Sequence, residues 1–328
     1  MMAPHFFIRK DSIMIVKLSF DKFVSIMENK VRDALGCIYE VRSIHVIKNN
    51  GINLWGLCIR CAGSSIAPNI YMNSYYESYT NGKDIEELVK DILKVYSISN
   101  KNMPSIEKNF DWESIKYDII LKLVNYDMNK ETLMESPFKK VFGNLAATFH
   151  ILVGSTKDGI GTAKINNELF LTFNVTLEHL YEIALANTMR WFPATIRNMN
   201  EVICTIMEEE LGGSEEYEKL WDTATINDGG AEMFVLSNNT GIYGATAVLY
   251  SDILKKFSET MNTDLYIIPS SVHEIIIMLA YGREFDCNML NEMVRNINSS
   301  HVPIEDILDN DVYMYQRSIN TIISFTGH

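Results

Sequence analysis

MFVLSNNTGIYGATAVLYSDILKKFSETMNTDLYIIPSSVHEIIIM, residues 233–278, is the stretch from which the fold can be predicted. Two β-prone runs, residues 233–236 and 243–250, flank the sequence Ser-Asn-Asn-Thr-Gly at 237–241. These residue types tolerate the positive φ angles that a tight reversal of the chain requires. The first part of the stretch therefore predicts a β-hairpin.

The rest of this stretch predicts a helix and a returning strand. Ser251 stands at the position of an N-cap, and apolar residues recur after it at helical spacing. They are Ile253, Leu254, Phe257 and Met261. Residues 265–268 and 275–279 are then apolar and β-prone, with a Pro-Ser-Ser corner between them. A hairpin, a helix and a returning strand together indicate an α+β layer.

Elements of the same kinds are predicted on the N-terminal side. Apolar residues at helical spacing predict a helix that begins near residue 20 and ends at Gly36. Asn-Gly between two β-prone runs, 38–47 and 52–61, predicts a hairpin. The elements expected next are a strand at 66–72, a tyrosine-containing loop at 73–82 and a helix at 84–96.

Further helices and strands are predicted between these elements and the C-terminus. They are a helix at 112–129, strands at 141–153 and 163–173, a helix between Thr176 and Pro193, helices at 200–210 and 288–297, and a strand at 312–325. The Gly-rich turn at 154–161 is followed by a strand-like run, whereas a phosphate-binding P-loop is followed by a helix. We find no nucleotide, flavin or metal motif and expect no cofactor.

The fold class predicted from these elements is α+β, with mixed or antiparallel sheets, helices packed on one face, and two units of similar size. The expected divisions are an N-terminal α+β unit at 1–136, a middle strand-helix segment at 137–210, an acidic linker at 211–230 and a C-terminal α+β unit at 231–328.

Size and charge limit the classes of function. The chain has 328 residues, of which 47% are apolar, and this is enough for a buried core. It carries 29 Lys and Arg against 42 Asp and Glu, a formal charge of -13. Binding to a phosphate backbone would oppose this charge, so we expect no nucleic acid partner.

The cysteines and the apolar runs indicate a cytoplasmic protein. Five cysteines, an odd and scattered set, do not form a secreted disulfide framework. Cys58 and Cys61 form a CxxC pair, but no second pair or His cluster completes a zinc site. The longest uncharged run, 233–251, has Ser, Asn, Thr and Gly at its centre, which favours a hairpin over a membrane span.

The strongest candidates for catalysis are Ser271, His273 and Glu274, which combine a hydroxyl, an imidazole and a carboxylate. Neighbouring residues on one strand or helix point in different directions, so a hydrolase would need a partner from elsewhere in the chain. The competing interpretation is structural. Ser271 and Glu274 have the spacing of a capping box, with His273 as a hydrogen-bonded corner residue.

Two aromatic groups are candidates for binding a partner. Tyr75, Tyr76 and Tyr79 could form a recognition surface, because tyrosine combines a large buried area with a polar tip. Arg190 and Trp191 could anchor a partner at the end of a helix. Each group could instead pack against its own unit, and the sequence leaves both interpretations open.

Four segments carry a resemblance to a known family. They are IYMNSYYESYTNG at 70–82, LKLVNYDMNK at 121–130, MFVLSNNTGIYGATAVLY at 233–250 and DLYIIPSSVHEIIIM at 264–278. In this order they resemble an uncharacterised bacterial family, a domain of unknown function that is common in Firmicutes and often found near plasmid-like or integrative elements. The resemblance implies a bacterial cytoplasmic origin and an accessory role on a mobile element. It assigns no catalytic residue.

The function expected from these observations is non-catalytic. We expect a soluble binding or accessory protein, such as an inhibitor or host-interaction factor of a mobile element. Its partner would be another protein, a basic one if the acidic segment makes the contact. The alternatives are a hydrolase-like enzyme that uses Ser271, His273 and Glu274, and an adaptor or chaperone for a basic client.

Overall fold

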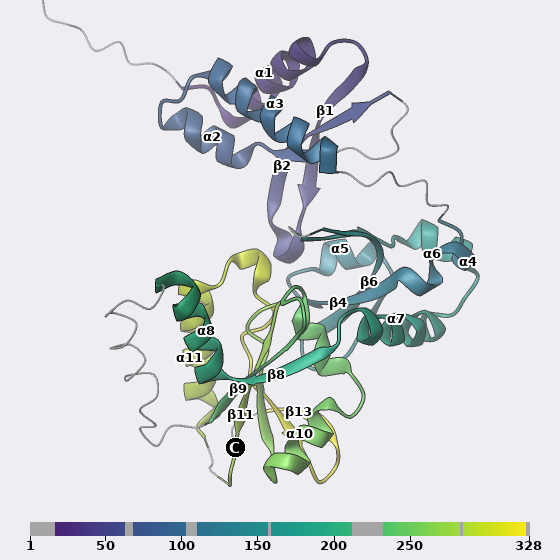
Figure 1. Ribbon diagram of the computed structural model, residues 1–328, viewed down its shortest axis with the longest axis vertical. Helices are drawn as coiled ribbons and strands as arrows, with labels where there is room; N and C mark the ends of the chain where they lie inside the picture. The colour runs from purple at the N-terminus through teal and green to yellow at the C-terminus, as the bar shows by residue number, and fades with distance from the viewer. Residues whose placement is uncertain are drawn as a thin grey trace, which may run out of the picture. The chain divides into compact units, whose positions relative to one another are not determined.

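The chain folds as an α+β protein with three antiparallel sheets, shown as a computed structural model in Figure 1. This confirms the predicted α+β class and the antiparallel sheets. The structure describes residues 17–62, 68–102, 110–156, 159–211, 232–282 and 285–325. Apart from Leu211, the predicted acidic linker at 211–230 lies outside the described residues.

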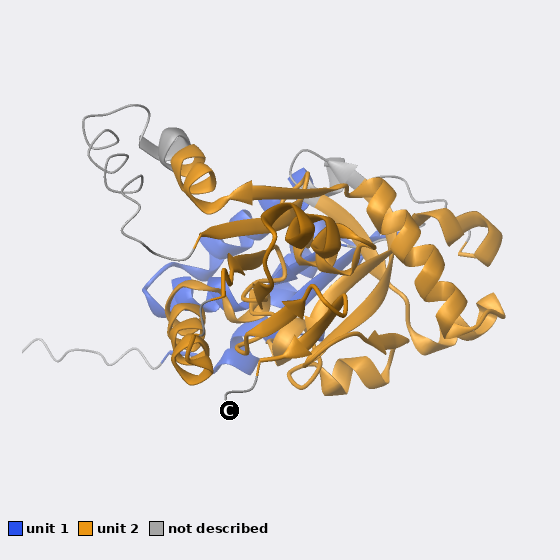
Figure 2. Cartoon of the chain, turned by 90° about the horizontal axis from the view of Figure 1, so that it is seen from below, with its two compact units in different colours: residues 1–46, 53–103 blue, residues 47–52, 104–328 orange. Residues whose placement is uncertain are grey.

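Two compact units make up the chain (Figure 2). The first comprises residues 1–46 and 53–103, and the second comprises residues 47–52 and 104–328. The second set of ranges is more than twice as long as the first, so the units are not of similar size. The expected boundaries at residues 136, 210 and 230 do not coincide with this division.

The first unit packs helices on a three-stranded sheet of order β1-β2-β3. Its elements are α1 (Phe20–Leu35), β1 (Tyr39–Ile47), β2 (Asn53–Cys61), β3 (Asn69–Tyr71), α2 (Asn73–Thr80) and α3 (Ile85–Asn102). Phe23, Met27 and Val31 recur on one face of α1 and are fully buried, as their helical spacing predicts. Residues 73–80, expected as a loop, form the helix α2. Two of its tyrosines, Tyr76 and Tyr79, lie at helical spacing and pack on Phe23 of α1.

A four-stranded sheet begins the second unit after residue 110. Its elements are α4 (Trp112–Ile115), η2 (Lys116–Asp118), β4 (Ile119–Asn125), α5 (Lys130–Met134), β5 (Phe138–Lys140), β6 (Leu145–Thr156), β7 (Gly159–Lys164), α6 (Asn167–Phe173) and α7 (Leu177–Trp191). Strand β6 pairs with β4 along one edge and with β5 and β7 along the other.

The predicted helix at 112–129 is wrong beyond its first turn, because residues 119–125 form the strand β4. Tertiary contacts override the helical spacing at this position. Strand β4 pairs with β6 on one side, and α7 covers its other edge. The Leu121 amide donates to Thr188 Oγ1 at 2.9 Å, and Asn187 Nδ2 donates to the Ile119 carbonyl at 3.0 Å. Side chains of α7 thereby satisfy backbone groups that an edge strand would leave unpaired.

The predicted strand at 163–173 is correct only to Lys164. The Asn166 side chain accepts a hydrogen bond from the Leu169 amide, and this cap begins the helix α6. The helix expected after Thr176 is confirmed as α7, and the Thr176 hydroxyl caps it by accepting from the His179 amide.

A six-stranded sheet of order β13-β12-β10-β11-β9-β8 forms the rest of the second unit. Its elements are β8 (Ala194–Asn198), α8 (Met199–Leu211), β9 (Met233–Asn238), η3 (Gly244–Leu249), α10 (Ile253–Met261), β10 (Leu265–Ile268), β11 (Ile275–Leu279), α11 (Cys287–His301), η4 (Ile304–Asp306), β12 (Tyr313–Gln316) and β13 (Thr321–Ser324). The strand expected at 312–325 is in fact the hairpin of β12 and β13.

The hairpin expected at 233–250 is also wrong. Strand β9 pairs with β8 and β11, while residues 244–249 form the 3-10 helix η3. Asn238 redirects the chain after β9, because its Oδ1 accepts from the Thr240 amide at 2.9 Å and its Nδ2 donates to the Ile242 carbonyl at 2.9 Å. Helix α10 begins after Asp252, which has a φ of 63°, so Ser251 is not its N-cap.

Alternation along β10 and β11 determines how the large sheet is covered. Leu265 and Ile267 face the main core of the second unit, which includes residues of α7, η3 and α10. Tyr266 and Ile268 face a smaller core with Leu290 and Val294 of α11. Helices therefore cover both faces of this sheet, so the expectation of helices on one face is wrong for it. Burial on both faces agrees with two strands that are apolar at every position. None of the helices that the structure describes is long and apolar enough to span a membrane.

Candidate functional site

A cavity of about 360 Å³ opens on the face of the four-stranded sheet that points away from the main core. We call it the lysine cavity and define it by Lys122, Thr148, His150, Lys164, Tyr243 and Asp306. Strands β4, β6 and β7 contribute its first four residues. The turn at 47–49 completes the lining and belongs to the second unit by its contacts.

Lys122 is the most deeply placed charged residue of the lysine cavity. Leu121 and Leu123 turn into the main core, so alternation along β4 places Lys122 on the opposite face. It is 8% exposed, and its Nζ donates to Thr162 Oγ1 at 2.8 Å. The same Nζ lies 3.6 Å from the centre of the Tyr243 ring. Burial lowers the pKa of this amine to about 8.

His150 and Lys164 lie beside Lys122 because of the strand register. Lys122 pairs with Thr148 across β4 and β6, and His150 pairs with Lys164 across β6 and β7. The Thr148 hydroxyl lies 3.0 Å from His150 Nε2. Burial, together with the charges of Lys122 and Lys164, lowers the pKa of His150 well below its usual range. The imidazole is therefore neutral at pH 7.

Tyr243 reaches the lysine cavity through the loop that follows β9. Its backbone has a φ of 52°, a left-handed conformation that is strained for a residue with a side chain. The next residue, Gly244, packs tightly: a Cβ there would lie 2.5 Å from the His273 carbonyl oxygen. The loop thus holds the Tyr243 ring over Lys122 at the cost of backbone strain.

His273 and the Asp306 carboxylate lie next to each other at one side of the site. His273 Nε2 lies 3.4 Å from Asp306 Oδ1, and its ring stacks on that of Tyr243. His273 Nδ1 accepts from the Tyr243 amide at 3.3 Å. From this network we assign the ring proton to Nε2, facing the carboxylate. Both ring nitrogens are engaged, and the ring supports Tyr243.

Buried asparagines hold the walls of the lysine cavity together within the second unit. Asn50 and Asn129 pair through their side chains at 2.9 Å, and the Asn50 amide also donates to Asn129 Oδ1 at 2.9 Å. Asn50 Nδ2 donates to the carbonyls of Ile304 and Ile307 at 2.7 and 2.6 Å. The turn at 47–52 and the segment before Leu308 are therefore joined by buried amide groups.

The three sequence candidates for catalysis are neighbours that do not converge. The Ser271 hydroxyl accepts from the His273 amide at 3.0 Å and makes no described contact with the His273 ring. Burial raises the pKa of Glu274. No helical turn begins at Ser271, so the capping-box interpretation is wrong, while that of His273 as a hydrogen-bonded corner residue is confirmed.

The aromatic candidates lie within their own units. The Tyr76 ring packs edge-on against Phe20 and at a tilt against Phe23, and its hydroxyl donates to the Leu18 carbonyl at 2.9 Å. Tyr79 also packs on Phe23, and Tyr75 lies at the edge of the same core.

At the end of α7, Arg190 Nη2 and Trp191 Nε1 both donate to the Tyr117 carbonyl, at 2.9 and 3.3 Å. Trp191 remains 44% exposed. Intramolecular contacts therefore account for the placement of Arg190 and Trp191, as they do for the three tyrosines.

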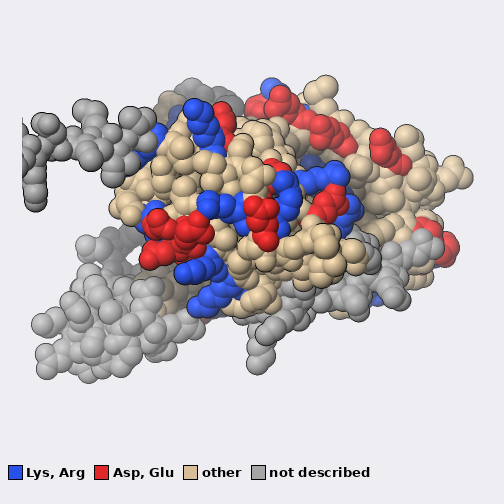
Figure 3. All heavy atoms as spheres, turned by 90° about the horizontal axis from the view of Figure 1, so that it is seen from above, with Lys and Arg blue, Asp and Glu red and all other residues tan. Residues whose placement is uncertain are grey.

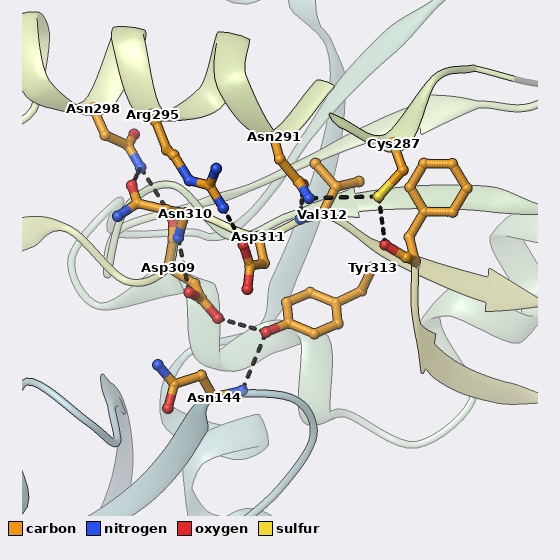
Figure 4. A network of polar contacts seen from close by, with 11 residues as sticks. Asn144, Cys287, Asn291, Arg295, Asn298, Asp309, Asn310, Asp311, Val312 and Tyr313 are labelled. Carbon is orange, nitrogen blue, oxygen red and sulfur yellow. Dashed lines mark hydrogen bonds and ion pairs between the residues drawn. The ribbon is translucent and has the colours of Figure 1, made fainter. Parts of the chain in front are cut away.

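A second, more open cavity of about 650 Å³ lies beside a polar network (Figure 4). The Tyr313 hydroxyl donates to Asp309 Oδ2 and accepts from the Asn144 amide. Burial raises the pKa of the Tyr313 hydroxyl and that of the Asp309 carboxyl group. Arg295 pairs with Asp311, and the Cys287 thiol donates to the Phe325 carbonyl. These groups satisfy one another, whereas the buried Asn298 Oδ1 of the same network has no hydrogen-bond partner among the described residues. The mutual contacts indicate a structural role.

Surface charges and potential metal ligands are the remaining features that could mark a site. On the face drawn in Figure 3, Lys and Arg side chains lie among Asp and Glu side chains and form no continuous basic patch. Within the described ranges, no group of three or more His, Cys, Asp or Glu residues could hold a metal ion. All five cysteines are free, including Cys58 and Cys61.

Sequence reasoning missed the principal residues of the lysine cavity. Its signal was a polar residue at alternate positions of an apolar run: Lys122 in IILKLVN, and Thr148 and His150 in LAATFHILV. Three of the four segments that carry the family resemblance supply residues of the site. The segment 121–130 contributes Lys122 and Asn129, the segment 233–250 contributes Tyr243, and the segment 264–278 contributes His273, which supports the Tyr243 ring.

Comparison with known proteins gives one match. Residues 20–317 match the model of a family described as "Family of unknown function (DUF5688)". No curated protein and no solved structure matches the chain.

Proposed function

The chain belongs to the family of unknown function DUF5688, and we propose from its own residues that it binds a small anionic molecule in the lysine cavity. The observation that carries this proposal is Lys122. The residue is only 8% exposed, yet its ammonium group pairs with no carboxylate among the residues that the structure describes. A buried charge is expensive unless it is paired. An anionic ligand would provide the missing charge.

The surroundings of Lys122 support an anion over a neutral ligand. Lys164 adds a second positive charge close enough to depress the pKa of His150. Thr148 and His150 offer further hydrogen-bonding groups on the same face of the sheet. Apolar contacts come from Ile47, Leu133 and Val272. Cavities of this size, apolar with a few convergent polar groups, are typical of sites for small molecules.

The geometry favours binding over hydrolysis. A serine hydrolase needs a hydroxyl within hydrogen-bonding reach of an imidazole nitrogen that can accept a proton. His273 Nδ1 accepts from a backbone amide, and its Nε2 faces Asp306. This arrangement supports a positioning role for His273.

A cytoplasmic location and an accessory role on a mobile element are also part of the proposal. The free cysteines and the family resemblance support the location, and the resemblance alone supports the role. A protein partner would act through a surface outside the lysine cavity. Binding of a small anion would then be the signal that the protein conveys to that partner.

Isothermal titration calorimetry of the full chain with inorganic phosphate, citrate and pyruvate tests the binding proposal. We expect at least one of these anions to bind, with an affinity that falls as ionic strength rises. Lys122→Met should weaken binding by about tenfold or more, since it removes a charge-assisted contact. Lys256→Met is the matched control, because it removes the same charge from an exposed position on α10.

Two results would contradict anion binding in the lysine cavity. One is the absence of measurable heat or thermal stabilisation with all three anions at low ionic strength. The other is an equal loss of affinity in the Lys122→Met and Lys256→Met variants, which would indicate a diffuse surface effect.

A further inference from the structure

We propose that Lys122 is a nucleophile that forms an imine with a small aldehyde or 2-oxo acid, whose acid group lies beside Lys164. This inference rests on the proposed anion site and deepens it. It names a reactive atom, Lys122 Nζ, and a chemical class of ligand that carries both a carbonyl and an acid group.

The contacts of Lys122 Nζ leave the amine suited to attack. Its described partners are the Thr162 hydroxyl at 2.8 Å and the face of the Tyr243 ring at 3.6 Å. Neither partner is an anion that would hold the extra proton on the nitrogen. A lysine desolvated in a pocket of this kind is an established type of activated nucleophile.

Five other lysines differ from Lys122 in their contacts. Each forms an ion pair with a carboxylate, which favours the protonated state of the amine. These pairs are Lys30–Glu86, Lys83–Asp91, Lys116–Glu113, Lys130–Asp127 and Lys139–Glu178. Lys122, in contrast, is deeply buried, lines a cavity and has no carboxylate partner among the residues that the structure describes.

The availability of the neutral amine agrees with this geometry. Burial lowers the pKa of Lys122 to about 8. At pH 7 about a tenth of such amines are neutral, a fraction a few hundredfold larger than for a lysine of ordinary pKa. The protein thus contains an amine that can attack a carbonyl near neutral pH.

The reaction is balanced without an oxidant or a further reactant. Lys122 Nζ attacks the carbonyl carbon, and a C–N bond forms. The carbonyl oxygen takes up two protons, both supplied in net terms by the amine, and leaves as water. The product is a C=N double bond between ligand and protein. His150, neutral and close to Lys122, is placed to relay a proton during the loss of water.

Lys164 would determine which carbonyl compounds react. It stands at the exposed side of the lysine cavity, on the strand next to His150. A carboxylate or phosphate beside Lys164 would hold the carbonyl carbon near Lys122, which raises the effective concentration of the reacting groups. A neutral aldehyde would lack this contact.

Reductive trapping tests the proposal. The full chain is incubated at pH 7.5 with pyridoxal 5′-phosphate, with pyruvate, or with butyraldehyde as a neutral carbonyl. Borohydride then reduces any imine to a stable amine, and peptide mass spectrometry locates it. We expect Lys122 to be modified at least about tenfold faster than Lys256, in keeping with its larger neutral fraction.

Three variants make this test specific. Lys122→Arg keeps the positive charge and should abolish the modification at this position. Lys164→Met should raise the concentration of pyridoxal 5′-phosphate or pyruvate needed for half-modification by about tenfold, with little effect on butyraldehyde. Lys256→Met should leave the modification of Lys122 unchanged. Circular dichroism checks that each variant is folded.

The outcomes separate this inference from the proposed function. If anions bind calorimetrically but Lys122 is modified no faster than Lys256, the imine is excluded and anion binding stands. If neither binding nor selective modification occurs, both proposals fail. If butyraldehyde modifies Lys122 as readily as the acidic carbonyls do, the assigned class of ligand is wrong.

Discussion

Lys122 is the residue at which the stability of this protein and its proposed function are most directly opposed. Its pKa is lowered to about 8 by burial, from an ordinary value of 10.5. The folded state therefore disfavours the protonated amine, and below about pH 8 this penalty amounts to about 3 kcal/mol. Binding sites often retain such unfavourable groups because the ligand compensates for them.

Lys122→Met should stabilise the ligand-free protein at pH 7 by on the order of 1–3 kcal/mol, since methionine is buried without charge. The unfolded state binds more protons than the folded state between about pH 8 and 10.5, so the wild type gains stability over that range. The difference between the two proteins should therefore shrink as pH rises. Urea unfolding at pH 7 and at pH 10 measures this.

A stability difference that stays constant between these two pH values would show that Lys122 keeps an ordinary pKa. Lys256→Met again serves as the control, because the loss of an exposed charge should change stability by only a few tenths of a kcal/mol at either pH.

At the level of elements, the loop from β9 to η3 shows how an unfavourable backbone conformation positions a side chain of the proposed site. Asn238 forms three side-chain hydrogen bonds within the loop, to Thr240 and to the Ile242 carbonyl. Gly244 then approaches Ser237 and His273 so closely that only a residue without Cβ fits. These constraints hold Tyr243 in its left-handed conformation.

Gly244→Ala should destabilise the protein by about 1–3 kcal/mol or more, because its Cβ would lie 2.8 Å from the Asn238 amide nitrogen and 2.5 Å from the His273 carbonyl oxygen. Displacement of Tyr243 should also weaken anion binding. Thermal unfolding and calorimetry measure the two effects.

Gly241→Ala is the control in the same loop. Gly241 has a φ of +69° but no atom within 4 Å of its Cβ position, so only a conformational cost of about 1 kcal/mol is expected. If both substitutions cost the same, close packing at Gly244 is not what constrains the loop.

The second unit, considered as a whole, is held together by contacts between segments far apart in the sequence. Asn50 bonds to Asn129 and to the carbonyls of Ile304 and Ile307. Asn125 Nδ2 donates to the Leu308 carbonyl at 3.0 Å. The lysine cavity depends on these contacts, because part of its lining comes from the same three regions of the chain.

Asn50→Ala should cost about 2–3 kcal/mol, because it removes the hydrogen bonds to the buried Ile307 carbonyl and the partly buried Ile304 carbonyl, and one of the two hydrogen bonds that Asn129 Nδ2 donates. It should also reduce anion binding, since Asn49 and Asn129 line the lysine cavity. Urea unfolding followed by calorimetry measures both.

Asn174→Ala is the matched control for this change. Asn174 is exposed and has a φ of 54°, close to the 58° of Asn50, so both substitutions carry the same backbone strain. A loss of stability as large as that of Asn50→Ala would assign the effect to the backbone instead of the buried bonds.

How far the sequence predicts this molecule depends on the range of the interactions involved. Helices α1 and α7 were predicted because their caps and apolar faces are set by neighbours a few residues away. Strand β4 was mistaken for a helix because its apolar residues fit helical spacing, and its pairing with β6 involves residues 20 or more positions away. The candidate site escaped prediction for the same reason.

The sequence by itself determined the α+β class, the helix faces, and the strands β10 and β11, since local spacing and burial of apolar residues suffice for these. Tertiary structure alone decided that residues 119–125 form a strand and that residues 244–249 form a 3-10 helix. It also decided that four side chains meet in one cavity, those of Lys122, His150, Lys164 and Tyr243. Those outcomes depend on strand register and close packing between distant segments, which no local pattern specifies.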